Sequence, residues 1–187
     1  MTKRLFAAIK ILPDKNFLDQ LDRLKSELGH EKIKWVENHN IHVTLKFFGE
    51  TDERKIPEIA GVLKKVAGEN ITFCFRLHSL GIFGSRYDPR VVWIGIEPYD
   101  RLVKLMMDLH NELKTIGYEP GRQNLVPHLT LGRIKEIKDK QLFQHTIENF
   151  KEISSPEMIA KEFLLYESIL KKEGPVYLVQ NTFPFSK

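Results

Sequence analysis

Apolar residues recur along the chain with two spacings, one typical of amphipathic helices and one typical of strands. Helical spacing predicts helices over residues 14–28, 52–67 and 100–116, and a more polar pattern predicts a fourth over 138–149. A glycine directly follows each of the first three and is expected to end it: Gly29, Gly68 and Gly117. Shorter apolar segments predict strands over 4–12, 33–36, 41–48, 71–83, 90–96, 128–134, 158–168 and 175–182.

Several predicted strands follow one another without an intervening helix, as in the pair 71–83 and 90–96 around a turn-rich segment. Such pairs favour an α+β fold with antiparallel pairing over a doubly wound parallel sheet. We expect Gly49-Glu50 to end the strand over 41–48. At 187 residues the chain is expected to form one domain, spanning 1–187.

Composition excludes several classes of protein. The chain is 42% hydrophobic and 29% charged, which is typical of a globular protein with its own core. Its net charge of +4 permits an anionic ligand without requiring one. Cys74 is the only cysteine, so no disulfide can form within the chain, and we expect it to be a small buried hydrophobic residue of a strand.

No apolar run approaches the roughly 20 residues of a membrane span. Lys10 interrupts the apolar run near the N-terminus, which is also too short for a signal peptide. We therefore expect a cytoplasmic protein without a membrane partner.

One short pattern occurs twice in the chain. Ile41-His42-Val43-Thr44-Leu45 and Pro127-His128-Leu129-Thr130-Leu131 both contain His-x-Thr-Leu within an apolar strand, 86 residues apart. Because strand side chains alternate between two faces, each strand presents one imidazole and one hydroxyl on the same face. If the chain consists of duplicated halves, a pseudo-twofold axis would bring the two pairs together.

Two imidazoles and two hydroxyls suit hydrolysis of a phosphodiester. A neutral histidine can remove a proton from the attacking water, and a protonated one can supply a proton to the leaving oxygen. The threonine hydroxyls can hold the non-bridging phosphate oxygens. Although His39 and His42 have a chelate-like spacing, they would point to opposite faces of a strand, so no metal site is expected.

The repeated motif and its flanks resemble those of the 2H phosphoesterases, and within them those of the RNA 2′,3′-cyclic phosphodiesterases, also called 2′-5′ RNA ligases. The resemblance covers nearly the whole chain. It includes 4–9, Glu37 to Glu50, 89–95, Pro127 to Arg133, 167–170 and 174–177.

This resemblance implies a bilobal α+β fold with two antiparallel-rich sheets, pseudo-twofold internal duplication around a central cleft, and helices on the outside. It implies hydrolysis of an RNA-terminal 2′,3′-cyclic phosphate to a 2′-phosphate, without metal or other cofactor, with reversal as 2′-5′ ligation. His42 would be the proton donor and His128 the proton acceptor, although the sequence alone does not fix this order. Thr44, Thr130 and Arg133 would bind the phosphate.

Strand alternation conflicts with a role for Arg133. Counting by twos from His128 places Thr130 and Gly132 on the histidine face and Arg133 on the other. Arg133 reaches the site only if the strand ends or bulges near Gly132, or if its side chain bends round from the rim. A solvated surface arginine is the alternative.

The same count places Lys46 on the face of His42, and Phe47 with the core residues Val43 and Leu45. Phe48, Phe83, Tyr87 and Tyr177 are further candidates for stacking on a base or lining the cleft.

The expected partner is RNA with a 2′,3′-cyclic phosphate end, tRNA-derived fragments among them, and the expected oligomeric state is a monomer. Two other functions stay open at this point. One is a phosphodiesterase for a small cyclic phosphate such as ADP-ribose 1″,2″-cyclic phosphate, and the other is a non-catalytic RNA-binding module.

Overall fold

The computed structural model describes residues 1–85, 87–118, 126–172 and 174–186. Their strands form one curled sheet whose order is β7-β4-β5-β6-β3-β1-β8-β9, with the short β2 paired to β6. The strands are β1 (Thr2–Lys10), β2 (Lys32–Trp35), β3 (His42–Asp52), β4 (Phe73–Gly84), β5 (Pro89–Glu97), β6 (His128–Glu136), β7 (Met158–Ala160), β8 (Glu162–Leu170) and β9 (Pro175–Pro184).

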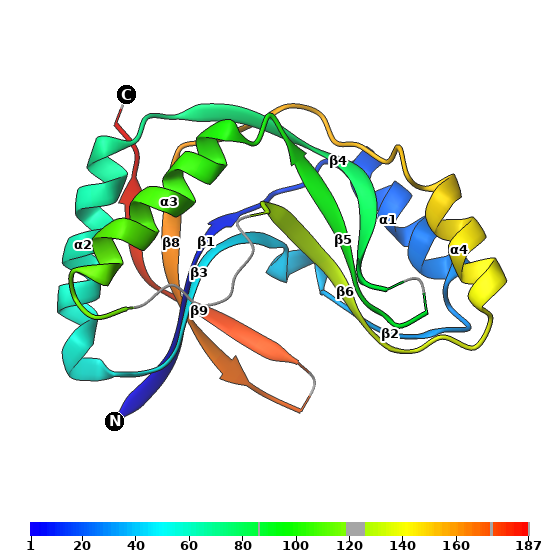
Figure 1. Cartoon of the computed structure of the whole chain (residues 1–187), viewed down its shortest axis with the longest axis horizontal. Coiled ribbons are helices and arrows are strands. Elements are labelled where there is room, and N and C mark those ends of the chain that lie inside the picture. Colours follow the sequence, from blue (N-terminus) through cyan, green and yellow to red (C-terminus); the bar gives the residue numbers. More distant parts are fainter. Residues whose placement is uncertain (86, 119–125, 173, 187) are drawn as a thin grey trace.

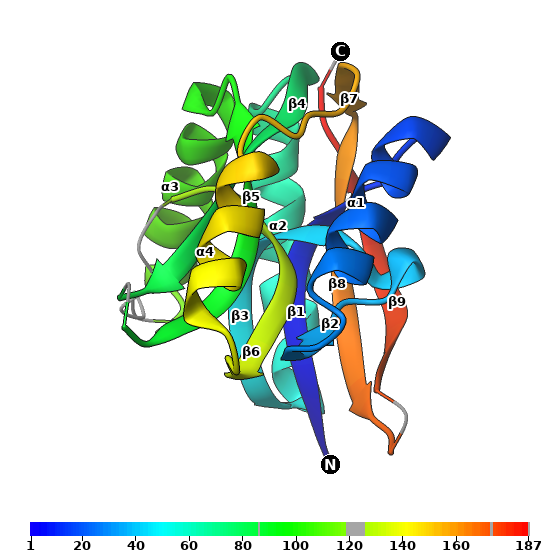
Figure 2. The ribbon, with the colours of Figure 1, turned by 90° about the vertical axis from the view of Figure 1, so that its right-hand side faces the viewer.

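Four helices lie on the outside of the sheet: α1 (Lys15–Glu27), α2 (Ile56–Glu69), α3 (Asp100–Lys114) and α4 (Lys140–Asn149). Figure 1 shows α2 and α3 over one end of the curled sheet and α1 and α4 over the other, and Figure 2 shows α1 and α4 on the same outer side. Short 3₁₀ turns, η1 (Asn38–Asn40) and η2 (Glu53–Lys55), precede β3 and α2. The predicted α+β fold with helices outside is confirmed.

Aspartate side chains cap two of the helices. Asp14 caps α1 by accepting a hydrogen bond from the Phe17 backbone N–H, and Asp139 caps α4 in the same way. The α1 stripe of Phe17, Leu21 and Leu24 is buried. The expected helix over 52–67 is wrong at both ends, because η2 occupies Glu53–Lys55 and α2 begins at Ile56 and continues through Gly68 to Glu69.

The two halves of the sheet, β7-β4-β5-β6 and β3-β1-β8-β9, form two lobes that exchange helices. α1 directly follows β1, yet it lies with α4 over the opposite half of the sheet (Figure 1). Gln20 of α1 donates a hydrogen bond to the Ser154 carbonyl beyond α4, and the buried Glu31 accepts from the Lys138 and Asp139 backbone N–H groups at the start of α4. Each lobe therefore needs segments from both halves of the sequence.

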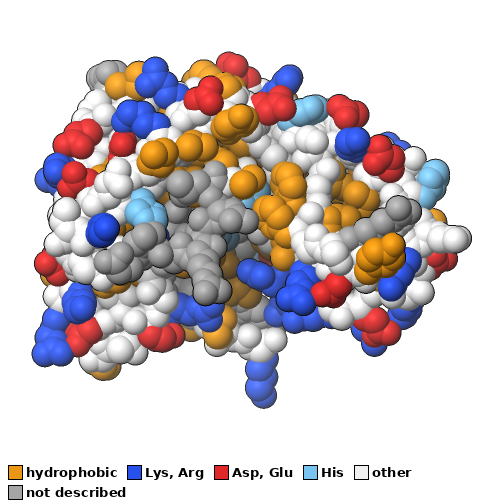
Figure 3. Space-filling view, in the orientation of Figure 1, with side chains coloured by type: hydrophobic (Ala, Val, Ile, Leu, Met, Phe, Trp, Pro, Cys, Tyr) orange, Lys and Arg blue, Asp and Glu red, His pale blue; other side chains and the backbone are white. Residues whose placement is uncertain are grey.

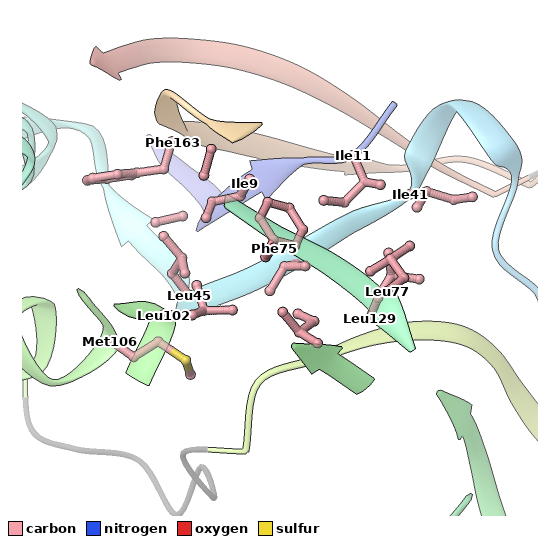
Figure 4. Packing of buried hydrophobic residues seen from close by; sticks show 14 of the residues in the cluster. Ile9, Ile11, Ile41, Leu45, Phe75, Leu77, Leu102, Met106, Leu129 and Phe163 are labelled. Atoms are coloured by element: carbon pink, nitrogen blue, oxygen red, sulfur yellow. The ribbon is translucent and has the colours of Figure 1, made fainter. Parts of the chain in front are cut away.

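One hydrophobic core continues across both lobes on the convex side of the sheet. Figure 4 shows side chains of β1, β3, β4, β6, β8 and α3 converging there. A second, smaller cluster of Phe6, Ala8, Leu164 and Tyr166, with Tyr177 packed against it, lies apart from this core. Because Phe6 and Ala8 alternate along β1 with the core residues Leu5, Ala7 and Ile9, the second cluster occupies the concave face.

The two motif strands contain the same β-bulge. In β3, Thr44 pairs with Ala8 but Lys46 pairs with Ala7, so Leu45 is an extra residue. In β6, Thr130 pairs with Trp93 but Gly132 pairs with Val92, so Leu131 is an extra residue. A bulge shifts the alternation of side chains by one residue. The residues after each leucine therefore lie on the opposite face of the sheet from the one that counting by twos along the sequence predicts.

Three predictions about the strands from 41 to 168 need correction. β3 continues to Asp52, because Gly49 (φ 72°) stands beside a register shift within the strand and does not end it. The expected strand over 158–168 is two strands, because the chain changes partner at Lys161 from β4 to β1 and β9. Cys74 is exposed, since its neighbours Phe73 and Phe75 take the core-facing positions of β4.

Gly132 is expected to tolerate no side chain. A Cβ atom there would lie 2.8 Å from Ile33 Cγ2 and from Trp35 Cε3 of β2. We expect Gly132→Ala to lower the free energy of unfolding by about 1–3 kcal/mol in urea titrations. The matched control is Gly61→Ala in α2, where a Cβ atom meets nothing within 4 Å, and this change should stabilise by about 0.5–1 kcal/mol. Equal effects of the two substitutions would contradict the close packing of β2 on β6.

Candidate active site

The two His-x-Thr-Leu strands meet at the centre of the sheet. β3 pairs with β6 through Val43 opposite Leu129, and these two residues occupy the same position in the two copies of the motif. Direct pairing of equivalent residues in antiparallel strands places a pseudo-twofold axis between them. The strand order is symmetric about this point, with β5, β4 and β7 on one side and β1, β8 and β9 on the other. The predicted duplication around a shared site is confirmed.

Val43 and Leu129 point into the core. His42 and Thr44 flank Val43, and His128 and Thr130 flank Leu129, so all four side chains lie on the opposite, concave face. All four are partly exposed, which leaves them accessible to a ligand. The structure thus brings both predicted pairs together at one place.

Both histidines are oriented by the same hydrogen bond. His42 Nδ1 lies 2.6 Å from the Asn40 carbonyl oxygen, and His128 Nδ1 lies 2.8 Å from the Val126 carbonyl oxygen. A carbonyl can only accept, so Nδ1 carries the proton in each ring. Nε2 is then the nitrogen left for proton transfer in both histidines.

Aromatic rings enclose His42. Its ring centroid lies 5.0 Å from Phe6 and 5.3 Å from Tyr177, with Tyr177 presented edge-on. Burial lowers the pKa of His42 from its ordinary value of 6.5, and the hydrogen bond to the Asn40 carbonyl acts in the opposite direction. The neutral imidazole is therefore the favoured form in the ligand-free protein.

His128 has an aromatic wall of its own. Its ring lies edge-on to Phe83 at 4.7 Å and to Trp93 at 6.3 Å, and Phe83 and Trp93 stack on each other at 5.0 Å. Phe83, a candidate ring for stacking on a terminal base, therefore lies beside His128. Tyr87 is almost fully exposed and lies on the turn between β4 and β5.

The bulge at Leu131 resolves the conflict over Arg133. With one extra residue in β6, Arg133 follows Thr130 onto the concave face, while the buried Gly132 packs toward β2. The charge of Arg133 acts on Tyr177 of the opposite lobe, where it opposes the rise that burial causes in the tyrosine pKa. Of the alternatives left open by the sequence, the structure shows the bulge.

The corresponding bulge at Leu45 reverses two predictions. Lys46 was expected on the histidine face, but it pairs with the core residue Ala7 and is buried. Phe47 was expected in the core, but it pairs with Phe6, lies 5.9 Å from that ring and is 49% exposed. Phe47 and Arg133 thus occupy equivalent concave positions in the two halves.

Sequence reasoning missed several residues that shape the site. Tyr166 stacks at 5.1 Å on Phe6, whose ring contacts His42. Asn40 donates a hydrogen bond to the Pro175 carbonyl at the start of β9, the strand that carries Tyr177. The signal for Phe6 was the unbroken apolar run Leu5 to Ile9, which is typical of a strand buried on both faces.

Metal-binding clusters and membrane-spanning helices are both absent from the residues that the structure describes. Among them, no three His, Cys, Asp or Glu side chains gather in a way that could hold a metal ion. Nor is any helix of this part of the chain both long enough and apolar enough to cross a bilayer.

The lowered pKa of His42 predicts a pH dependence of stability. Below pH 6.5 the unfolded chain binds a proton at His42 that the folded chain does not, so this contribution to stability is present above pH 6.5 and is lost as the pH falls through the folded pKa. In urea unfolding from about pH 8 to about pH 5, the wild type should lose more stability than His42→Gln. Identical pH profiles would contradict a buried neutral imidazole.

Comparison with known proteins agrees with this geometry. The family model described as LigT like Phosphoesterase matches twice, over residues 11–93 and 94–177, so each match contains one histidine motif. A protein named RNA 2′,3′-cyclic phosphodiesterase from Methanocaldococcus jannaschii is 35% identical over 94% of this chain and 97% of its own. One of the same name from Thermotoga maritima is 39% identical over 78% of this chain and 75% of its own.

Solved structures share the fold. TT0787 of Thermus thermophilus superposes with a TM-score of 0.79 at 27% identity, covering 97% of both chains. E. coli LigT complexed with 3′-AMP superposes with a TM-score of 0.76 at 21% identity, covering both chains fully. The two family matches, the relatives and the paired motifs together show that this chain belongs to the LigT-like phosphoesterase family, the family that its motifs resemble.

Proposed function

We propose that this protein hydrolyses the 2′,3′-cyclic phosphate at the end of an RNA to a 2′-phosphate, using His42 and His128 as acid and base. The observation that carries the proposal is the pair of imidazoles on one concave face, each with Nδ1 bonded to a backbone carbonyl and Nε2 free for proton transfer. The names of the relatives support the substrate class.

In the proposed reaction, His128 Nε2 accepts a proton from water as the water oxygen bonds to phosphorus. His42 Nε2 donates a proton to the 3′ oxygen as the bond between phosphorus and that oxygen breaks. The products are a 2′-phosphate and a free 3′-hydroxyl, and proton exchange with solvent restores both rings. With the 5′-hydroxyl of a second strand in place of water, His128 would accept the hydroxyl proton as that oxygen bonds to phosphorus, and His42 would again protonate the departing 3′ oxygen, which gives a 2′-5′ diester and so 2′-5′ ligation.

Thr44, Thr130 and Arg133 are proposed to hold the phosphate. The threonine hydroxyls lie beside the histidines on the concave face and can donate to non-bridging oxygens. The guanidinium of Arg133 offers paired donors in a geometry that matches a phosphate. Together they would stabilise the negative charge that builds on phosphorus in the transition state.

The enclosure of His42 fits a proton donor in one respect. A group whose pKa is lowered by burial releases its proton more readily, and the negative phosphate of a bound substrate would favour the protonated form at the moment it is needed. The assignment of donor to His42 and acceptor to His128 is part of the proposal.

An exposed aromatic on the site favours a nucleotide over a simple phosphoester. Phe47, on the concave face beside Phe6, offers a ring on which any terminal base can stack. The experiment below separates this function from the two alternatives, a phosphodiesterase for a small cyclic phosphate and a non-catalytic RNA-binding module.

We further propose that the protein acts as a monomer, since one chain supplies every group named. We place its action in the cytoplasm, with tRNA fragments among its substrates.

Substitution of either histidine tests the mechanism. In excess EDTA, the wild type should convert an RNA oligonucleotide with a 2′,3′-cyclic end to the 2′-phosphate. His42→Ala and His128→Ala should each lower kcat by about 10²–10⁴-fold, because an acid or a base is lost, while RNA binding is retained. His145→Ala on α4 is the matched control and should keep wild-type rates.

Retention of near-wild-type rates by either variant would contradict the site. Binding of RNA without turnover by the wild type would indicate the binding module. Neither binding nor turnover of RNA, with turnover of a small cyclic phosphate, would indicate the alternative enzyme.

Arg133 is expected to act on the phosphate. Arg133→Gln should lower kcat/KM by about 10–10²-fold, since a charge-assisted hydrogen bond to the phosphate is removed. Steady-state kinetics with the cyclic-ended oligonucleotide measures this, with Lys64→Gln on the outer helix α2 as a control of the same charge change. An unchanged kcat/KM would contradict a contact with the phosphate and would indicate that Arg133 is a solvated surface residue.

A further inference from the structure

A basic groove that includes Arg133 lies next to the β4–β5 turn. It has a volume of about 570 Å³ and runs along the ends of β5 and β6. The cations that line it are Arg90, Arg133, Lys135 and Lys140, and Tyr87 and Glu136 lie among them. Its volume is within the range of ligand-binding pockets, and all four cationic residues are exposed.

Acidic side chains among the described residues neutralise only part of the positive charge of the groove. Arg90 binds Asp88 at 2.8 Å, and Glu136 binds Lys32 of β2. Lys140 donates to the Tyr87 carbonyl at 3.5 Å, which leaves its charge uncompensated. Neither Arg133 nor Lys135 forms an ion pair with the described part of the chain, so the groove carries net positive charge.

One pair of cations is placed where it destabilises the sheet. Arg133 of β6 lies directly opposite Lys34 of β2 in the antiparallel ladder, and both are exposed. Like charges directly opposite each other on neighbouring strands repel. A phosphate bound near them would convert this repulsion into attraction to a shared anion.

The groove and the active site share a residue. Arg133 lines the groove and also acts electrostatically on Tyr177, whose ring contacts His42. In Figure 3 lysine and arginine side chains gather on the face that shows the ends of β5 and β6, next to the centre of the molecule. An RNA strand whose terminal phosphate lies at the histidines can therefore pass Arg133 and enter the groove.

From these observations we propose that this groove binds the backbone phosphates of the RNA nucleotides that precede the cyclic end. The inference rests on the proposed function, and it makes an RNA strand the substrate in preference to a mononucleotide. Lys135 and Lys140 neutralise phosphates, and the exposed ring of Tyr87 lies where an unpaired base can stack on it. The interactions are independent of base sequence, since they reach phosphates and ring faces only.

The test compares two substrates with the same reacting end: a mononucleoside 2′,3′-cyclic phosphate and a short single-stranded RNA oligonucleotide ending in that nucleotide. The variant Lys135→Gln/Lys140→Gln should raise KM for the oligonucleotide about 10-fold and leave its kcat and the turnover of the mononucleotide unchanged. The matched control is Lys64→Gln/Lys161→Gln, which removes the same charge from exposed positions outside the groove.

Direct binding gives a readout independent of catalysis. The dissociation constant of the 2′-phosphate-ended oligonucleotide, measured by fluorescence anisotropy over a range of salt, should depend on salt less steeply in the groove variant. The slope of log affinity against log salt should fall by about 1.4, because each phosphate of a single strand that a lysine no longer neutralises removes about 0.7. The control variant should keep the wild-type slope.

Equal KM and salt slopes for groove and control variants, with both substrates hydrolysed, would overturn the groove and leave the proposed function standing. Failure of the wild type to hydrolyse either substrate would instead overturn the proposed function. A groove variant whose mononucleotide turnover fell in parallel with its oligonucleotide turnover would also overturn the inference, because its lysines would then act on the reacting phosphate.

Discussion

The backbone pairing of Val43 with Leu129 is the interaction on which the rest of this molecule depends. It joins the two halves of the curled sheet at the centre of the strand order and pairs two residues that occupy the same place in a repeated motif. Since those two side chains are buried in the common core, the residues on either side must face the concave surface. The register of β3 against β6 thus determines the face on which all four motif side chains lie.

A twofold scaffold alone would give two identical half-sites, and here the surroundings of the two histidines differ. His42 lies among Phe6 and Tyr177, and burial lowers its pKa, whereas His128 lies against Phe83. Beyond the matching bulges, one half presents Phe47 and the other Arg133. Groups in different environments can take different roles in one reaction, and an aromatic and a cation suit different parts of a nucleotide.

The exchange of helices between lobes gives this arrangement its rigidity. α1 is joined to β1 but packs with α4, and Glu31 after α1 binds the backbone at the start of α4. The core on the convex side is continuous, so neither motif strand can move without disturbing side chains from both halves (Figure 4). The proposed reaction requires two imidazoles at a fixed separation and would benefit from such support, because small displacements of reacting groups are costly.

The sequence by itself determined the helices, most strands, the α+β class and the two His-Thr pairs, because these depend on local periodicity, capping residues and a repeated motif. It did not determine the face of any residue beyond Leu45 and Leu131. Alternation with period two predicted Lys46 toward the ligand and Phe47 toward the core, and both were wrong. Whether Arg133 reaches the site, and whether residues 158–168 form one strand or two, was likewise decided by pairing with distant strands. A bulge adds one residue opposite a partner remote in sequence, so only the tertiary structure can place it.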